Sequence, residues 1–309
     1  MEPTPSWTPR VVAVVGPTAS GKSDLGVALA LALDGEVVNA DSMQLYRGMD
    51  VGTAKLSQAE RHGVPHHLLD VWDVTQTASV ADYQSRARAV VDALRAAGRT
   101  PVLVGGSGLY VRAVLDQLEF PGTDPGVRAR LEAELTALGP GALHERLASL
   151  DPAAAAAILP SNGRRIVRAL EVGEVTGASF TATLPDARDL YPSVQIGLDV
   201  PRALLDRRID ERVERMWAAG LVDEVRRLLE RGLRSGITAS RALGYTQVLR
   251  LLDGELTEAD ALAETQRATR RFARRQETWF RRDDRVLWLP YDAPDLQSRA
   301  YEAATTIAP

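Results

Sequence analysis

The sequence of 309 residues contains no cysteine, which excludes disulfide bonds, iron–sulfur clusters and thiolate zinc sites. It has no apolar run approaching the roughly 20 residues that a membrane-spanning helix needs. It also lacks a strong excess of charge, since the formal net charge is −4, so any surface that binds nucleic acid must be local. The N-terminal residues 1–10 are proline-rich and not basic. We therefore expect a flexible N-terminal tail and a cytoplasmic, soluble, monomeric protein without a membrane partner.

Lysine is nearly absent as well, and one of the only two lysines, Lys22, lies in the stretch around which the chain is organised. Residues 16–23, which we call the glycine loop, match the phosphate-binding pattern G-x-x-x-x-G-K-[ST]. An apolar, β-branched segment (residues 11–15) precedes the loop, and a helix-forming segment (residues 24–33) follows it. A strand, a loop and a helix in this order direct backbone N–H groups and a helix N-terminus at one point, which attracts phosphate.

Lys22 adds a positive charge to this point, and the Ser23 hydroxyl is a candidate ligand for Mg²⁺. A plain glycine-rich turn is the alternative, but it does not explain the lysine. The expected phosphate-binding residues are Gly16, Pro17, Thr18, Ala19, Ser20, Gly21, Lys22 and Ser23.

Two further strand ends carry polar residues. A strand expected over residues 36–41 ends at Asp41, and one over residues 100–104 is followed by Gly-Gly-Ser-Gly, which contains Ser107. Because ligands of open parallel sheets bind beyond the carboxyl ends of the strands, Asp41 and Ser107 are expected at the same edge as the glycine loop. The glycines would let the backbone approach a ligand. The alternatives are a helix N-cap for Asp41 and a tight turn around Ser107.

The pattern changes after a proline- and glycine-rich linker at residues 118–126. Helices are expected over residues 127–138, 142–150, 152–159 and 163–176, and the next strand over residues 194–200. We therefore predict an α/β fold: a P-loop-type parallel sheet flanked by helices, with an all-helical insertion domain. The core domain would comprise residues 11–120 and 193–309, and the insertion residues 121–192.

A helix expected over residues 257–280 is strongly basic. The segment 266–282 contains seven arginines, among them Arg274 and Arg275, and one acidic residue, Glu277. Their spacing places most of them along one helix face, while Phe272 and Trp279 are expected to anchor the other face in the core. We favour a contact with a polyanion over a merely solvated helix, because acidic partners one turn away are nearly absent.

These features leave the reaction open. An ATPase motor is disfavoured, since no apolar strand closes directly in a metal-binding acid. A small-molecule kinase with Asp41 as the base for an acceptor hydroxyl and a non-catalytic, phosphate-sensing RNA-binding protein both fit the pattern.

A resemblance narrows the choice. Eight motifs occur in the same order as in the tRNA dimethylallyltransferase (tRNA isopentenyltransferase) family, which the chain resembles over roughly residues 11–290. They are the glycine loop, Asn39-Ala40-Asp41-Ser42-Met43-Gln44-Leu45-Tyr46, Gly52-Thr53-Ala54-Lys55, His66-His67-Leu68, Gly105-Gly106-Ser107-Gly108-Leu109-Tyr110, Arg165-x-x-Arg168-Ala169-Leu170-Glu171-Val172, Leu243-Gly244-Tyr245 and Arg274-Arg275-Gln276-Glu277-Thr278-Trp279-Phe280-Arg281.

The resemblance implies transfer of a dimethylallyl group from dimethylallyl diphosphate to the exocyclic N6 amine of the adenine 3′-adjacent to the anticodon. Asp41 would be the general base, Ser107 and Lys22 further catalytic residues, and Mg²⁺ the cofactor. Arg208 and Arg212 resemble a family segment that contacts the diphosphate. Of the two, we include Arg212 among the expected diphosphate-binding residues. The implied contacts with the tRNA anticodon stem-loop are Asp41, Ser42, Met43, Gln44, Ser107, Arg128, Arg164, Arg165, Arg168, Arg241, Gly244 and Tyr245, to which we add Arg274 and Arg275 from the basic helix.

The sequence departs from the usual family pattern at three places, and one rival function remains open. Ser23 and Ser107 stand where many members have threonine, and residues 160–163 depart from the commoner Pro-Asn-Asp turn. The rival within the superfamily is an adenylate isopentenyltransferase, which would need neither the helical insertion nor the basic helix.

Overall fold

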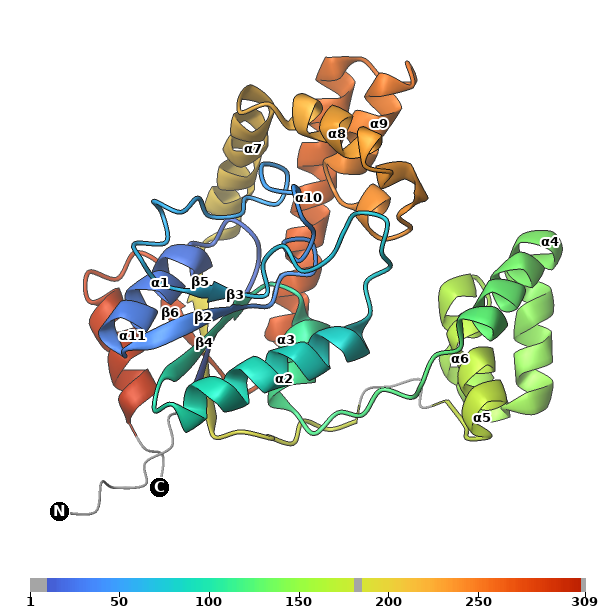
Figure 1. Ribbon diagram of the computed structural model, residues 1–309, viewed down its shortest axis with the longest axis horizontal. Coiled ribbons are helices and arrows are strands. Elements are labelled where there is room, and N and C mark those ends of the chain that lie inside the picture. Colours follow the sequence, from blue (N-terminus) through green and yellow to red (C-terminus); the bar gives the residue numbers. More distant parts are fainter. Residues whose placement is uncertain (1–9, 181–184, 307–309) are drawn as a thin grey trace. The chain divides into compact units, whose positions relative to one another are not determined.

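The computed structural model describes residues 10–180 and 185–306. The expected tail at residues 1–10 thus lies, except for Arg10, outside the described residues. The chain divides into two compact units, an α/β core (residues 1–116 and 189–309) and a helical insertion (residues 117–188), and each is described by itself (Figure 1). No helix in the described part of the chain is both long and apolar enough to cross a membrane.

The core is built on a parallel six-stranded sheet in the order β3-β2-β4-β1-β5-β6. The strands are β1 (Val11–Val15), β2 (Gly35–Asn39), β3 (His66–His67), β4 (Thr100–Gly105), β5 (Ser193–Asp199) and β6 (Val286–Pro290). The predicted parallel α/β fold is therefore confirmed. The sequence analysis identified β1, β2, β4 and β5 but missed the edge strands β3 and β6.

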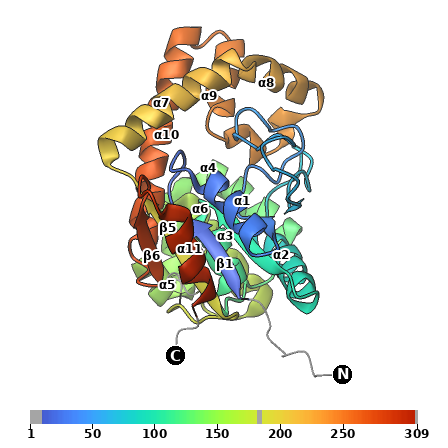
Figure 2. The ribbon, with the colours of Figure 1, turned by 90° about the vertical axis from the view of Figure 1, so that its left-hand side faces the viewer.

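Helices cover both faces of this sheet. The helices nearest to it are α1 (Lys22–Ala32), α2 (Val80–Ala96), α3 (Gly108–Leu115) and α11 (Leu296–Thr305). Alternate residues of β1 belong to two hydrophobic clusters: Val11, Ala13 and Val15 pack with α2 and α3, and Val12 and Val14 pack with α1 and α11. This alternation, which follows from the two-residue period of a strand, buries both faces. Figure 2 shows α1 and α11 side by side on their common face.

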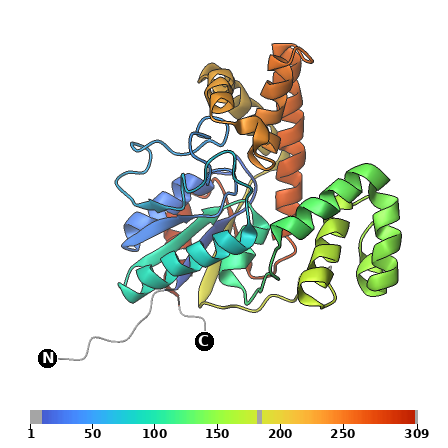
Figure 3. The same ribbon diagram turned by 45° about the vertical axis from the view of Figure 1, so that its right-hand side comes forward.

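A group of helices follows β5 in the chain: α7 (Arg202–Ala218), α8 (Leu221–Glu230), α9 (Tyr245–Leu252) and α10 (Glu258–Phe280), with short 3₁₀ turns at Leu233–Ser235 and Ala239–Arg241. The long helix α10 packs against α7, α9 and α3, so it connects the helical group to the sheet (Figure 3). The expectation that Trp279 anchors the helix in the core is wrong: this residue is 38% exposed, and the next residue, Phe280, is buried instead.

The insertion has its own hydrophobic core, formed by α4 (Pro125–Leu150), α5 (Pro152–Ala157) and α6 (Gly163–Thr176). The two helices expected over residues 127–150 correspond to the two halves of α4, which is interrupted where Gly139 has a φ of 79° and precedes Pro140. The compact unit begins and ends slightly before the expected bounds of 121–192. The boundary falls where Asp116 and Asp189, both residues of the core unit, form an antiparallel β-bridge and both pair with Arg285.

Candidate functional site

The glycine loop connects β1 directly to α1, as expected. Gly16, Ala19 and Gly21 have φ values of 128°, 65° and 99°, and such alternation turns successive backbone N–H groups toward one side. A positive φ is uncommon for alanine, so the loop holds a specific and somewhat strained conformation. The Ser20 hydroxyl is buried and has no hydrogen-bond partner among the described residues. The loop therefore contains an unsatisfied polar group of the kind that a phosphate oxygen would satisfy.

Lys22, the first residue of α1, lies beside the loop and donates a hydrogen bond to the Pro17 carbonyl at 2.5 Å. Burial and the nearby Arg212 guanidinium lower the pKa of Lys22 to about 7, while the Asp41 carboxylate acts in the opposite direction. This environment disfavours the charged form of the lysine. An anion bound in the loop would favour the charged form and raise the pKa again.

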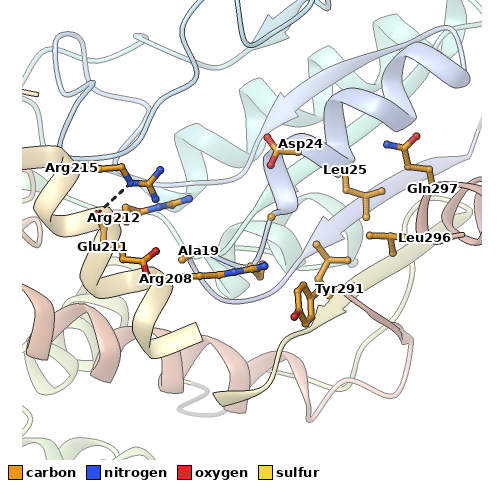
Figure 4. A pocket seen from close by; sticks show the side chains of 13 residues that line it. Ala19, Asp24, Leu25, Arg208, Glu211, Arg212, Arg215, Tyr291, Leu296 and Gln297 are labelled. Carbon is orange, nitrogen blue, oxygen red and sulfur yellow. Dashed lines mark hydrogen bonds between the residues drawn. The ribbon is translucent and has the colours of Figure 1, made fainter. Parts of the chain in front are cut away.

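A pocket of about 530 Å³ opens between the glycine loop and α7 (Figure 4). Arg208, Arg212 and Arg215 line it from one face of α7. Arg212 donates a long hydrogen bond of 3.4 Å to the Thr18 hydroxyl, and burial lowers the pKa of Arg212. Arg208 lies over the Tyr291 ring, 4.5 Å from its centroid. The expected phosphate contact Arg212 is therefore next to the loop. The sequence analysis missed Arg215, although the spacing 208, 212, 215 was a visible signal.

Asp41 and Ser107 lie at the carboxyl ends of the neighbouring strands β2 and β4. The Ser107 hydroxyl accepts a hydrogen bond from the Ser42 N–H (3.3 Å), and an Asp41 carboxylate oxygen accepts one from the Met43 N–H (2.9 Å). Burial raises the pKa of Asp41, although the Met43 N–H, Lys22 and Arg212 partly oppose this. The structure thus brings the two residues together beside Lys22, as the sequence analysis expected. The N-cap alternative for Asp41 is wrong, since turns follow it and the next helix begins only at Val80.

Gln276 of α10 connects the two loops of this site, a function that the sequence analysis missed. Its side-chain oxygen accepts a hydrogen bond from the Thr18 N–H at 2.9 Å, and its side-chain nitrogen donates one to the Gly106 carbonyl at 2.9 Å. A Cβ on Gly106 would lie 2.2 Å from that nitrogen. Glycine at this position therefore makes room for Gln276, and the expected approach of this backbone to a ligand stays a prediction.

A second long-range contact holds the loop at residues 50–52. The Glu224 carboxylate of α8 accepts hydrogen bonds from the N–H groups of Asp50 (3.0 Å), Val51 (2.7 Å) and Gly52 (3.1 Å). Tyr245 donates its hydroxyl to the same carboxylate at 2.6 Å and is fully buried. A buried carboxylate with four donors fixes this segment of the loop.

The same contacts correct two expected RNA contacts. Tyr245 and Gly244 are both buried, so in this structure they support the loop from within and present no surface to RNA. The loop in turn holds Gln44, whose side chain donates a hydrogen bond to the Thr53 carbonyl at 3.1 Å. Ser42, Met43 and Gln44 are half-buried at the edge of the site.

The expected arginines of the insertion fall into two pairs. Arg128 and Arg168 both donate to the fully buried carboxylate of Glu171, and these hydrogen bonds lower its pKa although burial raises it. Arg164 and Arg165, in the first turn of α6, are exposed and have no ionic partner in the described part of the chain. The first pair stabilises the insertion, and the second is free to bind an anion at a helix N-terminus.

The arginines of α10 also differ from one another. Arg274 lies 3.8 Å from Asp206 of α7, and Arg270 pairs with Asp210 of the same helix. Arg275 has no acidic partner within the described residues and lies near the Phe272 ring. Acidic residues of α7 therefore offset the charge of Arg270 and Arg274. The spacing of residues within α10 could not show this. The remaining expected arginine, Arg241, is exposed at the end of a 3₁₀ turn.

The residues present fit a magnesium ion that is held mainly by phosphate and water. Among the described residues the Ser23 hydroxyl makes no hydrogen bond and stands in the first turn of α1. Within the same residues, no group of three or more histidine, cysteine or acidic side chains could hold a metal by itself. This donor set suits Mg²⁺, which usually takes one or two protein ligands together with substrate phosphates.

Comparison with known proteins gives consistent matches. The family model "IPP transferase" matches residues 44–283. The tRNA dimethylallyltransferase of Thermobifida fusca (strain YX) is 73% identical over 296 residues, covering 94% of this chain and 93% of the relative. The crystal structure of the full-length tRNA isopentenylpyrophosphate transferase from Bacillus halodurans has a TM-score of 0.70 and 43% identity, covering 96% of this chain and 94% of that one.

A eukaryotic dimethylallyltransferase acting on tRNA shares the fold, with a TM-score of 0.81 and 24% identity over 94% of this chain and 77% of that one. The extent and identity of the sequence matches confirm the resemblance that the eight motifs indicated. This chain belongs to the tRNA dimethylallyltransferase (IPP transferase) family.

Proposed function

We propose that this protein transfers a dimethylallyl group from dimethylallyl diphosphate to the N6 amine of the tRNA adenine 3′-adjacent to the anticodon, and releases diphosphate. The C–O bond between the allylic carbon and the diphosphate breaks, a C–N bond forms, and the amine loses one proton. The observation that carries the proposal is the position of the glycine loop beside the half-buried Asp41 carboxylate in a chain of this family.

The glycine loop would hold the diphosphate as it departs. Its turned N–H groups, the Ser20 hydroxyl and the N-terminus of α1 all favour an anion, and Lys22 and Arg212 supply positive charge. Such preorganised donors stabilise the charge that develops on the leaving group. A Mg²⁺ ion on Ser23, when bound, would neutralise further negative charge of the diphosphate.

Asp41 would accept the proton of the attacking amine. Its raised pKa makes it a stronger base than an ordinary aspartate once it is ionised. Ser107 and Ser42, which share a hydrogen bond, would position the adenine beside it. The base must leave its stack to reach this site, and single-stranded loop bases are the ones that can do so.

The insertion arginines yield a first prediction. We expect Arg128→Ala to destabilise the insertion by about 1–3 kcal/mol, because a buried carboxylate loses a charged partner. The matched change Arg164→Ala should leave stability within about 0.5 kcal/mol, since that residue is exposed and has no ionic partner among the residues that the structure describes. Thermal unfolding of the full chain measures the first effect, and tRNA binding at constant salt should weaken in the Arg164 variant. Equal losses of stability in both variants would refute the distinction.

The arginines of α10 yield a second prediction. Arg275→Ala should weaken tRNA binding and reduce the slope of log K against log salt by about 1, as expected for one lost phosphate contact. Arg274→Ala should change the slope less, because Asp206 already offsets its charge. Arg299→Ala, which removes an exposed arginine of α11, is the control. An unchanged slope in the Arg275 variant would mean that α10 is merely a solvated helix.

The proposed reaction is tested by transfer of label. Dimethylallyl diphosphate labelled in its prenyl group should label tRNA but not AMP, and no phosphate should move from labelled ATP to any acceptor. Label in AMP alone would identify an adenylate isopentenyltransferase, and phosphate transfer from ATP would identify a kinase. Either result would overturn the proposal.

A further inference from the structure

Trp279 lies at the edge of the candidate site and not in the core. The residue is 38% exposed, and its indole packs on Gly108, the residue after Ser107. A Cβ on Gly108 would lie 2.0 Å from the indole nitrogen. Glycine at this position therefore makes room for the ring, which is held against the start of α3, where α10 and α3 are in contact (Figures 1 and 3).

A short series of contacts connects this ring to Asp41. The Ser107 N–H donates to the Ala40 carbonyl at 3.3 Å, and the Ser107 hydroxyl accepts from the Ser42 N–H. Ala40 and Ser42 flank Asp41 in the chain, and Gly108 follows Ser107. The indole thus contacts the loop that contains Ser107, and this loop is hydrogen-bonded to both neighbours of Asp41, the proposed base for the target adenine.

Two arginines stand close to Trp279 in the sequence, along α10 and the turn that follows it. Arg275 lies one helical turn before Trp279 and Arg282 three residues after it, and neither has an ionic partner in the described part of the chain. An exposed aromatic ring with cations nearby on the same element is a combination that binds single-stranded nucleic acid, since a base stacks on the ring and phosphates contact the cations.

We propose that Trp279 is a stacking platform for an anticodon-loop base that flanks the target adenine. This inference rests on the proposed function. When an adenine leaves its stack, each neighbouring base loses a partner on one face, which costs a few kcal/mol. The indole replaces that partner, so Trp279 contributes to tRNA recognition and to keeping the loop in its opened form.

The test is a double-mutant cycle between protein and RNA. Anticodon stem-loop RNAs are prepared intact, with an abasic nucleotide on the 5′ side of the target adenine, and with one on its 3′ side. Binding of each is measured to the unaltered protein, to Trp279→Ala, to Trp279→Phe, and to Tyr301→Ala, which removes an exposed aromatic ring on α11.

Trp279→Ala should weaken binding of the intact RNA by about 5- to 100-fold, the range for loss of one stacked base. Trp279→Phe should retain most of the affinity, and Tyr301→Ala should retain all of it. One of the two abasic RNAs should bind the unaltered protein correspondingly more weakly, yet bind the Trp279→Ala variant within about twofold of the intact RNA, because coupled partners are not additive.

Two results would overturn the inference: unchanged affinity in Trp279→Ala, or additive losses with both abasic RNAs. Failure of the proposed function is distinguishable from either, since it would appear as an absence of prenyl transfer by the unaltered protein to intact tRNA. The binding cycle itself needs no donor substrate.

Discussion

Asp41→Asn is expected to lower the rate of prenyl transfer by about 10²–10⁴-fold while tRNA still binds. The amide keeps the shape of the carboxylate and can still accept the Met43 N–H, so the turn at residues 39–43 should persist. It cannot accept the proton of the attacking amine. Single-turnover transfer with saturating donor and tRNA measures the loss, and tRNA binding by the same variant is the control.

The same assignment predicts how the rate of prenyl transfer depends on pH. Because burial raises the pKa of Asp41, the carboxylate becomes protonated at a higher pH than an ordinary aspartate. The single-turnover rate of the unaltered protein should therefore rise as the pH rises through that pKa, and the Asn variant should lack this rise. Normal chemistry in the variant, combined with lost tRNA binding, would contradict the assignment of Asp41 as the base.

Lys22→Met is expected to lower kcat/KM for dimethylallyl diphosphate by about 10²–10³-fold, the range for removal of one donor to a developing anion. The loop loses the hydrogen bond from Lys22 to the Pro17 carbonyl, but the contact between Gln276 and the Thr18 N–H should keep it in place. The affinity for tRNA should change little. A variant with normal kcat/KM for the donor would exclude this loop as the diphosphate site.

The lowered pKa of Lys22 also predicts how kcat/KM for the donor depends on pH. The free protein has a lysine with a pKa of about 7, so kcat/KM for the donor should fall as the pH rises above that value and the charge is lost. The kcat should fall less, since bound diphosphate favours the protonated lysine. Lys22→Arg, which stays charged, should move this decline to higher pH. An unmoved decline would assign it to another group.

The elements that could be predicted from sequence are those whose signal is local. A window of about a dozen residues is enough to predict the buried runs of β1 and β4, the glycine loop between β1 and α1, and the amphipathic helices. The edge strand β6 was missed although Val286–Pro290 has five residues, as many as β1, because it follows charged residues directly and ends in proline. Its assignment depends on pairing with β5, which lies far away in the sequence.

The same distinction applies to the site. Lys22, Asp41 and Ser107 follow strand ends, so the topology of a parallel sheet predicts that they meet. Gln276 and Glu224 are ordinary polar residues in helices, and their functions arise from contacts with loops more than a hundred residues away. The motif around Tyr245 suggested a contact with RNA, yet its hydroxyl binds Glu224 inside the core. A motif reports that a residue matters, but not which surface it faces.

The central claim is that the glycine loop binds the departing diphosphate while Asp41 faces the amine of an extruded adenine. A structure of the protein with an unreactive dimethylallyl diphosphate analogue and an anticodon stem-loop tests both parts at once. The account predicts the diphosphate on the backbone N–H groups of residues 19–23 and an Asp41 oxygen about 2.6–3.2 Å from the adenine N6. A diphosphate bound elsewhere, or an Asp41 carboxylate turned away from the base, would contradict it.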